Sequence, residues 1–224
     1  MMFNKYNRYA KLFPALLTFI PALVLLLLSN NTEMMFIVNV IMRMTVGVAI
    51  VWFFAFINRL LGKAIFQTLF FKNENEMPTT NFLLPSDTTL SPSMKKAIRD
   101  KLKNDFNIDL PSARDEAKNI DKSRKQIIYA VSQMRNSTRG NELLLQHNYE
   151  YGFIRNLLGG SIVAFLVCIF NLYFFRNINI NTTGFNLSLG LGISYLLLLL
   201  LSKPLTEMLG RNYAKVLFEQ YLHH

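Results

Sequence analysis

The sequence predicts an all-α membrane protein with four transmembrane helices and a helical cytoplasmic insert between the second and the third, assembled as a homo-oligomer. Hydrophobic residues make up 51% of the 224 residues, which is high for a soluble protein but ordinary for a small multi-pass membrane protein. They concentrate in two blocks, 12–71 and 157–201. Each block is long enough for two membrane-spanning helices of about 20 residues.

The four spans are expected at 12–28, about 34–57, 157–175 and about 185–201. At ~1.5 Å per residue these lengths are enough to cross a bilayer core of ~30 Å, the shorter ones barely. The first span follows three positive charges, as a signal peptide does, but SNNTE after it offers no small-residue cleavage site. We therefore expect this segment to be retained as a span.

The distribution of positive charge predicts the orientation. Twenty-two of the 24 Lys and Arg residues lie before residue 12, between residues 58 and 156, or after residue 201. The two loops on the other side of the membrane hold only Arg176. Because cytoplasmic loops carry an excess of Lys and Arg, both termini and the insert are expected in the cytoplasm.

The chain is expected to divide into four parts. They are an N-terminal membrane hairpin with a helical extension, 1–71; a basic helical cytoplasmic domain, 72–156; a C-terminal membrane hairpin, 157–201; and an amphipathic tail helix, 202–224. The tail helix is expected on the membrane surface or on the cytoplasmic domain. One continuous helix of about 30 residues is expected from Glu142 through Phe175, because no proline interrupts this stretch.

Local signals predict the first elements of the insert. Residues after Lys72 are rich in Pro, Thr, Ser and Asn and predict a loop, with one short extended piece at Phe82–Leu84. Ser91 and Pro92 then provide an N-cap and a first-turn proline for a helix that ends near Phe106.

An apolar seam with a 3.5-residue period follows a capping box formed by Ser112 and Asp115, in which Asp replaces the usual Glu or Gln. Such a period is typical of a helix packed lengthwise against another helix. The seam consists of Ala113, Ala117, Ile120, Arg124, Ile127, Val131 and Met134. Two interpretations stay open: packing within the chain, with Arg124 at an edge, or a helical contact between subunits.

The sequence holds no recognisable catalytic or cofactor chemistry. It contains neither the phosphate-binding motif GxxxxGK[ST] nor the zinc motif HExxH. His147 is the only internal histidine, and Glu150 shares its face, but no further ligand completes a metal site. The single cysteine, Cys168, excludes a disulfide within the chain. We therefore expect no enzymatic activity, no metal and no other cofactor.

The insert carries a local excess of positive charge, with 16 Lys and Arg against 11 Asp and Glu between residues 58 and 156. Clusters of this kind bind the phosphates of nucleotides, nucleic acid or lipid headgroups. The candidate ligand-binding residues are Lys95, Lys96, Arg99, Lys101, Lys103, Lys118, Lys122, Arg124, Lys125, Arg135 and Arg139. Whether they form a solvated or lipid-facing surface, or a site for a specific anionic ligand, stays open.

Four polar or small residues are candidates for an intramembrane site. Asn39, Arg43 and Gly47 are spaced four apart and share a face of the second span, and Asn171 lies in the third. A charge near the midplane, where Arg43 falls, costs ~2.5–3.5 kcal/mol or more. Either Arg43 pairs with backbone carbonyls or Asn171 inside one bundle, or reaches outward toward the side of Glu33, or it faces a water-filled axis between several copies. Four short spans can hardly enclose a pore, so a pore requires a homo-oligomer.

The layout of paired spans, a basic helical insert, and paired spans again resembles the small membrane effectors of bacterial anti-phage operons, including nucleotide-signalling and Hailong-like systems. The resemblance covers the layout of the whole chain, and no motif carries it. It implies that the soluble part receives a nucleotide or oligonucleotide signal made by a companion protein. It also implies that the spans compromise the inner membrane.

Three functional hypotheses follow. The first is an oligomeric channel-like protein whose cytoplasmic domain senses a ligand or partner. The second is a membrane-anchored adaptor without a pore. The third, a membrane enzyme, is disfavoured by the missing site chemistry.

Overall fold

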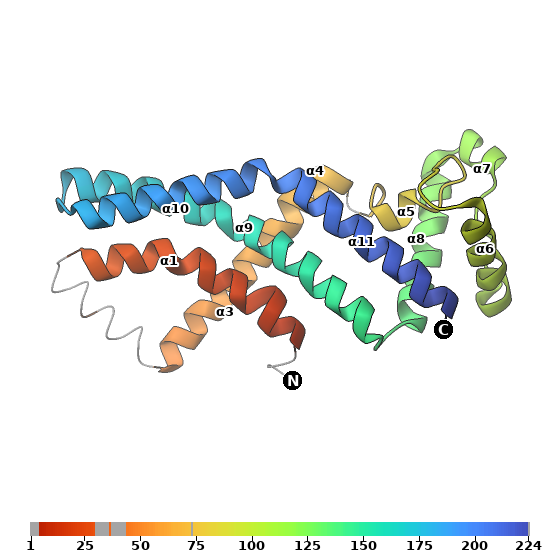
Figure 1. Cartoon of the computed structure of the whole chain (residues 1–224), viewed down its shortest axis with the longest axis horizontal. Helices are drawn as coiled ribbons and strands as arrows, with labels where there is room; N and C mark the ends of the chain where they lie inside the picture. The colour runs from red at the N-terminus through yellow and green to blue at the C-terminus, as the bar shows by residue number, and fades with distance from the viewer. Residues whose placement is uncertain (1–4, 30–35, 37–43, 73, 224) are drawn as a thin grey trace. The chain divides into compact units, whose positions relative to one another are not determined.

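The computed structural model describes residues 5–29, 36, 44–72 and 74–223. These residues form helices joined by turns, and no β-strand occurs among them, which confirms the all-α prediction (Figure 1). In chain order the elements are η1 (Asn7–Leu12), α1 (Phe13–Leu28), α3 (Met44–Leu61), η2 (Gly62–Gln67), α4 (Thr68–Phe71), α5 (Pro78–Asn81), α6 (Pro92–Phe106), α7 (Ala113–Lys118), α8 (Ile120–Ser137), α9 (Glu142–Asn177), α10 (Thr182–Leu200) and α11 (Ser202–His223). Both η1 and η2 are π-helical turns.

The chain folds into two compact units. The membrane unit consists of Met1–Phe66 and Gly152–Leu205, and the basic unit consists of Gln67–Tyr151 and Thr206–His224. Both expected hairpins thus contribute to one unit, and most of the tail helix belongs to the same unit as the insert. Helices α9 and α11 each contribute residues to both units.

Among the described residues, four helical segments are long and apolar enough to cross a membrane. They are Asn7–Leu28, Gly47–Phe71, Glu142–Asn177 and Thr182–Leu200. The finding supports a multi-pass membrane protein. The second segment includes η2 and α4, which continue α3 as far as Phe71, where the helical extension of the second span was expected to end. Residues 37–43 of the expected span lie outside the described part of the chain. The predicted long helix after residue 142 is confirmed by α9.

Glycines allow the backbones of α3 and η2 to approach α9 closely in the membrane unit. A Cβ atom added to Gly159 would lie 2.2 Å from the Asn58 carbonyl oxygen, and one added to Gly62 would lie 2.4 Å from the Arg155 carbonyl oxygen. Small residues have this role between membrane helices generally, because packing there replaces the hydrophobic driving force. Larger side chains at these positions would push the two helices apart.

Helices α9 and α10 form an antiparallel hairpin with a defined register. A Cβ atom added to Gly184 would meet the Phe175 ring at 2.8 Å, and one added to Gly192 would meet the Cys168 Cβ atom at 3.4 Å. Cys168 is buried with Tyr195 in the apolar core of this pair. Cys168 therefore packs as a small hydrophobic side chain.

The basic unit has its own apolar core, to which the C-terminal helix contributes. Ile98 and Leu102 of α6 are buried with Ile127 and Met134 of α8, and Phe218 of α11 is buried in the same cluster. The C-terminal helix is therefore part of a packed core along its second half, where side chains such as Phe218 are fully buried.

The last turn of α11 is fixed by a polar contact as well. The Tyr221 hydroxyl donates a hydrogen bond of 3.0 Å to Asp105 Oδ2, and Lys101 Nζ lies 5.4 Å from the centre of the Tyr221 ring. Burial, and then the hydrogen bond to Asp105, raises the pKa of Tyr221. The tyrosine is thus held as a neutral donor.

Two predicted helix starts are confirmed, and one element was wrongly predicted. The Ser91 side chain accepts a hydrogen bond from the Met94 N–H, and Ser112 forms a complete capping box with Asp115, which lowers the pKa of the Asp115 carboxyl group. Residues 82–84 are not extended. They form turns after α5, and their side chains are buried in the core of the basic unit.

The predicted seam is interrupted at Asn119. This residue has extended backbone angles, and its side chain caps α8 by accepting a hydrogen bond from the Lys122 N–H. The second half of the seam, from Ile127 to Met134, is buried within the chain. The first half is exposed, including Ile120. Packing within the chain therefore accounts for the second half of the seam.

The close approach of α3 and α9 predicts a large difference between two Gly→Ala substitutions. Gly159→Ala places a methyl group against backbone atoms that cannot turn aside, so we expect it to lower the stability of the protein by ~1–3 kcal/mol. Gly190→Ala is the matched control, since a Cβ atom there would meet nothing within 4 Å. Thermal unfolding in detergent, followed by the fluorescence of the single tryptophan, measures both. Equal melting temperatures for the two variants would contradict the close contact.

Candidate functional site

A carbonyl group of η1, the π-helical turn that leads into α1, accepts a hydrogen bond from a side chain of another helix. Pro14 has no N–H, so the carbonyl of Ala10 cannot receive the usual α-helical hydrogen bond from four residues on. Asn156 of α9 supplies a replacement, because its side-chain amide donates a hydrogen bond of 2.5 Å to the Ala10 carbonyl oxygen. Asn156 is fully buried.

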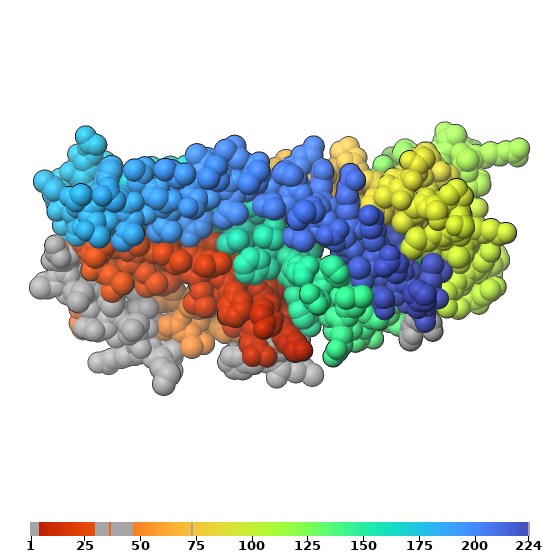
Figure 2. Space-filling model, in the orientation of Figure 1, coloured from red at the N-terminus to blue at the C-terminus, as the bar shows by residue number. Residues whose placement is uncertain are grey.

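The same arrangement recurs two turns further along α1. Pro21 lies inside the helix and deprives the Leu17 carbonyl of its α-helical partner. The Tyr195 hydroxyl of α10 donates a hydrogen bond of 2.7 Å to this carbonyl oxygen. Figure 2 shows α10 directly against α1 along this part of the membrane unit.

Three asparagines complete the set. The Asn171 amide donates to the Pro21 carbonyl at 2.8 Å, the Asn181 amide donates to the Leu28 carbonyl at 3.0 Å, and the Asn179 amide donates to the Ser29 carbonyl. The last two carbonyls lie at the end of α1, where a helix leaves its carbonyls without partners. We call the five donors the carbonyl clamp; they are Asn156, Asn171, Asn179, Asn181 and Tyr195.

The clamp has a clear physical purpose inside a membrane. No water is present in the bilayer core to satisfy a carbonyl in the middle of a span, such as that of Leu17, so leaving it without a partner costs several kcal/mol. Helix α3 is tied to α1 by a related contact, in which the Asn58 amide donates 2.8 Å to Thr18 Oγ1. Thr18 Oγ1 in turn donates 2.9 Å to the Pro14 carbonyl.

Two buried polar atoms of the membrane unit have no hydrogen-bond partner among the described residues. They are Asn171 Oδ1 and Ser188 Oγ. The hairpin register places the two residues at the same level, because Ser188 lies midway between the glycines that meet Phe175 and Cys168. An unsatisfied buried acceptor or donor costs ~1–3 kcal/mol, so this level of the unit is less stable than its packing alone implies.

The predicted intramembrane residues are only partly described. Asn39 and Arg43 lie outside the described residues, and Gly47 is half-buried in α3. Asn171 is fully buried and belongs to the carbonyl clamp. Its amide group therefore has a partner on α1.

Six of the eleven predicted ligand-binding cations are engaged within the basic unit. Lys95 Nζ donates to the Leu84 carbonyl at 2.6 Å and to the Asp87 carbonyl at 2.5 Å. Burial lowers the pKa of Lys95, although the Asp87 carboxylate acts in the opposite direction. An Arg99 guanidinium N–H donates to the Pro111 carbonyl at 3.2 Å. These two side chains therefore hold the turns on either side of α6.

Two lysines of α6 form ion pairs with nearby aspartates. Lys101 Nζ lies 3.6 Å from Asp105 Oδ2, and Lys103 Nζ lies 2.5 Å from Asp109 Oδ2. Both pairs are at least partly exposed to solvent, where such contacts contribute little to stability. The pairs nevertheless neutralise two of the eleven positive charges that the sequence suggested for a ligand.

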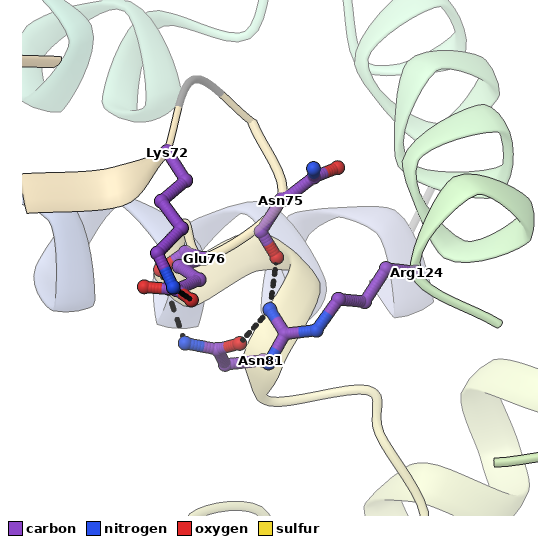
Figure 3. Close-up of polar contacts among 5 residues, drawn as sticks. All are labelled: Lys72, Asn75, Glu76, Asn81 and Arg124. Carbon is purple, nitrogen blue, oxygen red and sulfur yellow. Dashed lines mark hydrogen bonds and ion pairs between the residues drawn. The ribbon is translucent and has the colours of Figure 1, made fainter. Parts of the chain in front are cut away.

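Arg124 joins α8 to the turn that precedes α5. Its Nη1 atom donates to the Asn75 carbonyl and, at 2.9 Å, to Asn81 Oδ1 (Figure 3). On the other side of this turn, Lys72 Nζ pairs with Glu76 Oε1 at 2.6 Å. A guanidinium group suits this contact because its N–H groups diverge in a fixed plane.

Arg135 is the sixth engaged cation. It donates to Thr79 Oγ1 at 3.4 Å, lies 3.9 Å from Glu74 Oε1, and stands 6.0 Å from the centre of the Tyr213 ring. Burial raises the pKa of Tyr213, and the nearby Arg135 charge works against that increase. Arg135 therefore packs α8 against α5 and α11.

The other five predicted cations are all exposed; they are Lys96, Lys118, Lys122, Lys125 and Arg139. Lys122 and Lys125 share the exposed face of α8 with Tyr129, whose side chain is 58% exposed. In the part of the chain that the structure describes, Lys125 and Tyr129 make no side-chain hydrogen bond or ion pair. We call Lys122, Lys125 and Tyr129 the α8 face.

Sequence reasoning missed Tyr129 and the carbonyl clamp. Tyr129 follows Lys125 by four residues and Lys122 by seven, which places all three on one helical face. The clamp had a signal as well, since Pro14 and Pro21 are seven residues apart and leave two carbonyls on the same side of α1. The donors could not be identified from this spacing.

Comparison with protein-family models, with curated proteins and with solved structures finds no match. The helices themselves define the class, a multi-pass helical membrane protein with a separate polar unit.

Proposed function

We propose that the protein is an oligomeric channel-like effector that permeabilises the inner membrane under the control of an anionic ligand or partner at its basic unit. The observation that carries this proposal is the α8 face, where Lys122 and Lys125 stand exposed beside Tyr129. Lysines attract phosphates, and an exposed aromatic ring stacks on a base. A nucleotide or oligonucleotide is therefore the ligand class that fits.

The route from the ligand to the membrane would run along the helices that both units share. Helix α9 begins in the basic unit and continues into the membrane unit as a single helix. Ligand binding at the α8 face is proposed to act on the spans through this helix. Both termini and the basic unit would lie in the cytoplasm, as the charge distribution suggests.

The ion path is proposed to lie on the axis of a homo-oligomer, lined by the face of Asn39, Arg43 and Gly47. A buried cation requires water or polar partners, and an axis between subunits supplies water. A role in anti-phage defence, with the ligand made by a companion protein, rests on the resemblance in layout alone.

The first functional prediction concerns the α8 face. Lys122→Gln with Lys125→Gln should weaken binding of a fluorescent single-stranded oligonucleotide at least several-fold at low salt. The slope of log affinity against log salt should fall by ~1.4, since each lost phosphate contact contributes ~0.7. Fluorescence anisotropy of the full-length protein at several salt concentrations measures both quantities.

The matched control is Arg211→Gln with Lys215→Gln, which removes the same charge from exposed positions of α11. Equal weakening by the two double variants would show that net charge, and not the α8 face, attracts the ligand. Ligand binding without ion flux from vesicles in the parent protein would favour the adaptor without a pore.

The second functional prediction concerns Arg43. Arg43→Leu should leave the oligomer intact but change ion flux, because the only charge on the proposed path is removed. Arg43→Lys should retain part of the parental flux, since the charge remains while the planar guanidinium is lost. Vesicle flux and oligomer size in detergent are measured together. If Arg43→Leu dissociates the oligomer, Arg43 is a structural pairing group instead.

A further inference from the structure

We propose that α1 is a movable helix of the membrane unit and that the carbonyl clamp, with the Tyr195–Leu17 hydrogen bond at its centre, is the latch that holds it in place. The latch is inferred from the contacts of the membrane unit alone. Only its consequence for ion flux rests on the proposed function.

Two carbonyls of the η1–α1 segment, those of Ala10 and Leu17, lack an α-helical hydrogen bond and are bonded by the carbonyl clamp instead. Pro14 and Pro21 each remove one backbone hydrogen bond, and sharp bends of helices occur mostly at prolines. The π-helical turn η1 ends at Leu12, two residues before Pro14, and such turns are frequent at functional sites. The helix can therefore bend at these points at a lower cost than an uninterrupted helix.

Side chains of other helices donate the hydrogen bonds that the two prolines cannot donate. The Tyr195 hydroxyl and the Asn156 amide bond the carbonyls that the prolines expose, at 2.7 and 2.5 Å. These bonds come from α10 and α9, so they can open without unfolding the helix that provides the donor.

The latched state also leaves two buried polar atoms without hydrogen-bond partners among the described residues, which costs free energy. Asn171 donates to the Pro21 carbonyl, but its own Oδ1 atom has no partner among the described residues, and neither does Ser188 Oγ on the facing helix. A side chain that turns away from Pro21 could bring these two groups into one hydrogen bond. A released state in which Asn171 bonds Ser188 therefore satisfies groups that the latched state leaves unpaired.

Release of α1 would leave several polar groups exposed between α1 and the α9–α10 hairpin. The Leu17 carbonyl, the Tyr195 hydroxyl and the Asn171 amide all lie between α1 and the α9–α10 hairpin. Once separated from one another, they would require water or ions as partners. A bend of α1 thus converts a dry, internally bonded contact into one that water can enter.

The test compares Tyr195→Phe with Tyr173→Phe in the full-length protein in lipid nanodiscs. Tyr195→Phe removes only the latch hydroxyl, whereas Tyr173 is 59% exposed on α9 and serves as the control. Hydrogen–deuterium exchange should accelerate about tenfold in peptides of α1 in Tyr195→Phe and stay unchanged in α3 and α11. The control should exchange like the parent.

Ser188→Ala tests the same latch in the opposite direction. It removes one of the unpaired oxygens of the latched state and the partner that Asn171 would gain on release, so α1 should exchange more slowly than in the parent. Faster exchange in Ser188→Ala would overturn the proposal. Unchanged exchange in Tyr195→Phe, or acceleration spread over every helix, would overturn it too.

Ion flux from vesicles separates the latch from the proposed function. A higher flux of Tyr195→Phe without added oligonucleotide, together with faster exchange of α1, supports the latch as a gate. Faster exchange of α1 with no flux in any variant, the parent included, would leave the latch standing and remove the channel.

Discussion

The arrangement of the membrane unit depends on how the backbone carbonyls of α1 are satisfied. Pro14 and Pro21 take two hydrogen bonds out of a helix that has no water available in the bilayer. The carbonyls of Ala10 and Leu17 are instead bonded by Asn156 and Tyr195. The donors fix the position of α1 against α9 and α10, and the glycines of α9 then admit α3 at backbone contact. Hydrogen bonds thus set the positions of the helices, and apolar side chains fill the space between them.

The basic unit uses its charges in two ways. Arg124 and Arg135 hold the turn around α5 to α8, and Lys95 holds the turn before α6. These contacts engage cations that the sequence offered as candidates for ligand binding. Five of the eleven cations are left without such contacts among the described residues, and two of these, Lys122 and Lys125, lie on α8 beside Tyr129. A smaller and more defined surface therefore replaces the broad basic cluster that composition suggests.

Much of the fold follows from local sequence signals, while the polar contacts do not. The apolar runs, the Ser91 cap, the Ser112 capping box and the long α9 are local features with strong physical causes, and all of them appear in the structure. The break at Asn119 was missed, because a capping side chain interrupts an apolar period that otherwise continues. The role of Arg124 and the partners of the α1 carbonyls depend on residues more than 40 positions away. Spacing along the chain carries no information about such partners.

The central claim is that Tyr195 replaces the hydrogen bond that Pro21 removes, and a double-mutant cycle tests it directly. Pro21→Ala restores an N–H for the Leu17 carbonyl, so the Tyr195 hydroxyl should become dispensable in that background. Reversible unfolding in detergent should show that Tyr195→Phe lowers stability by ~0.5–1.5 kcal/mol in the parent and much less in Pro21→Ala, a non-additive pair. Equal losses in the two backgrounds would mean that the tyrosine does not compensate for the proline, and the account of α1 would be wrong.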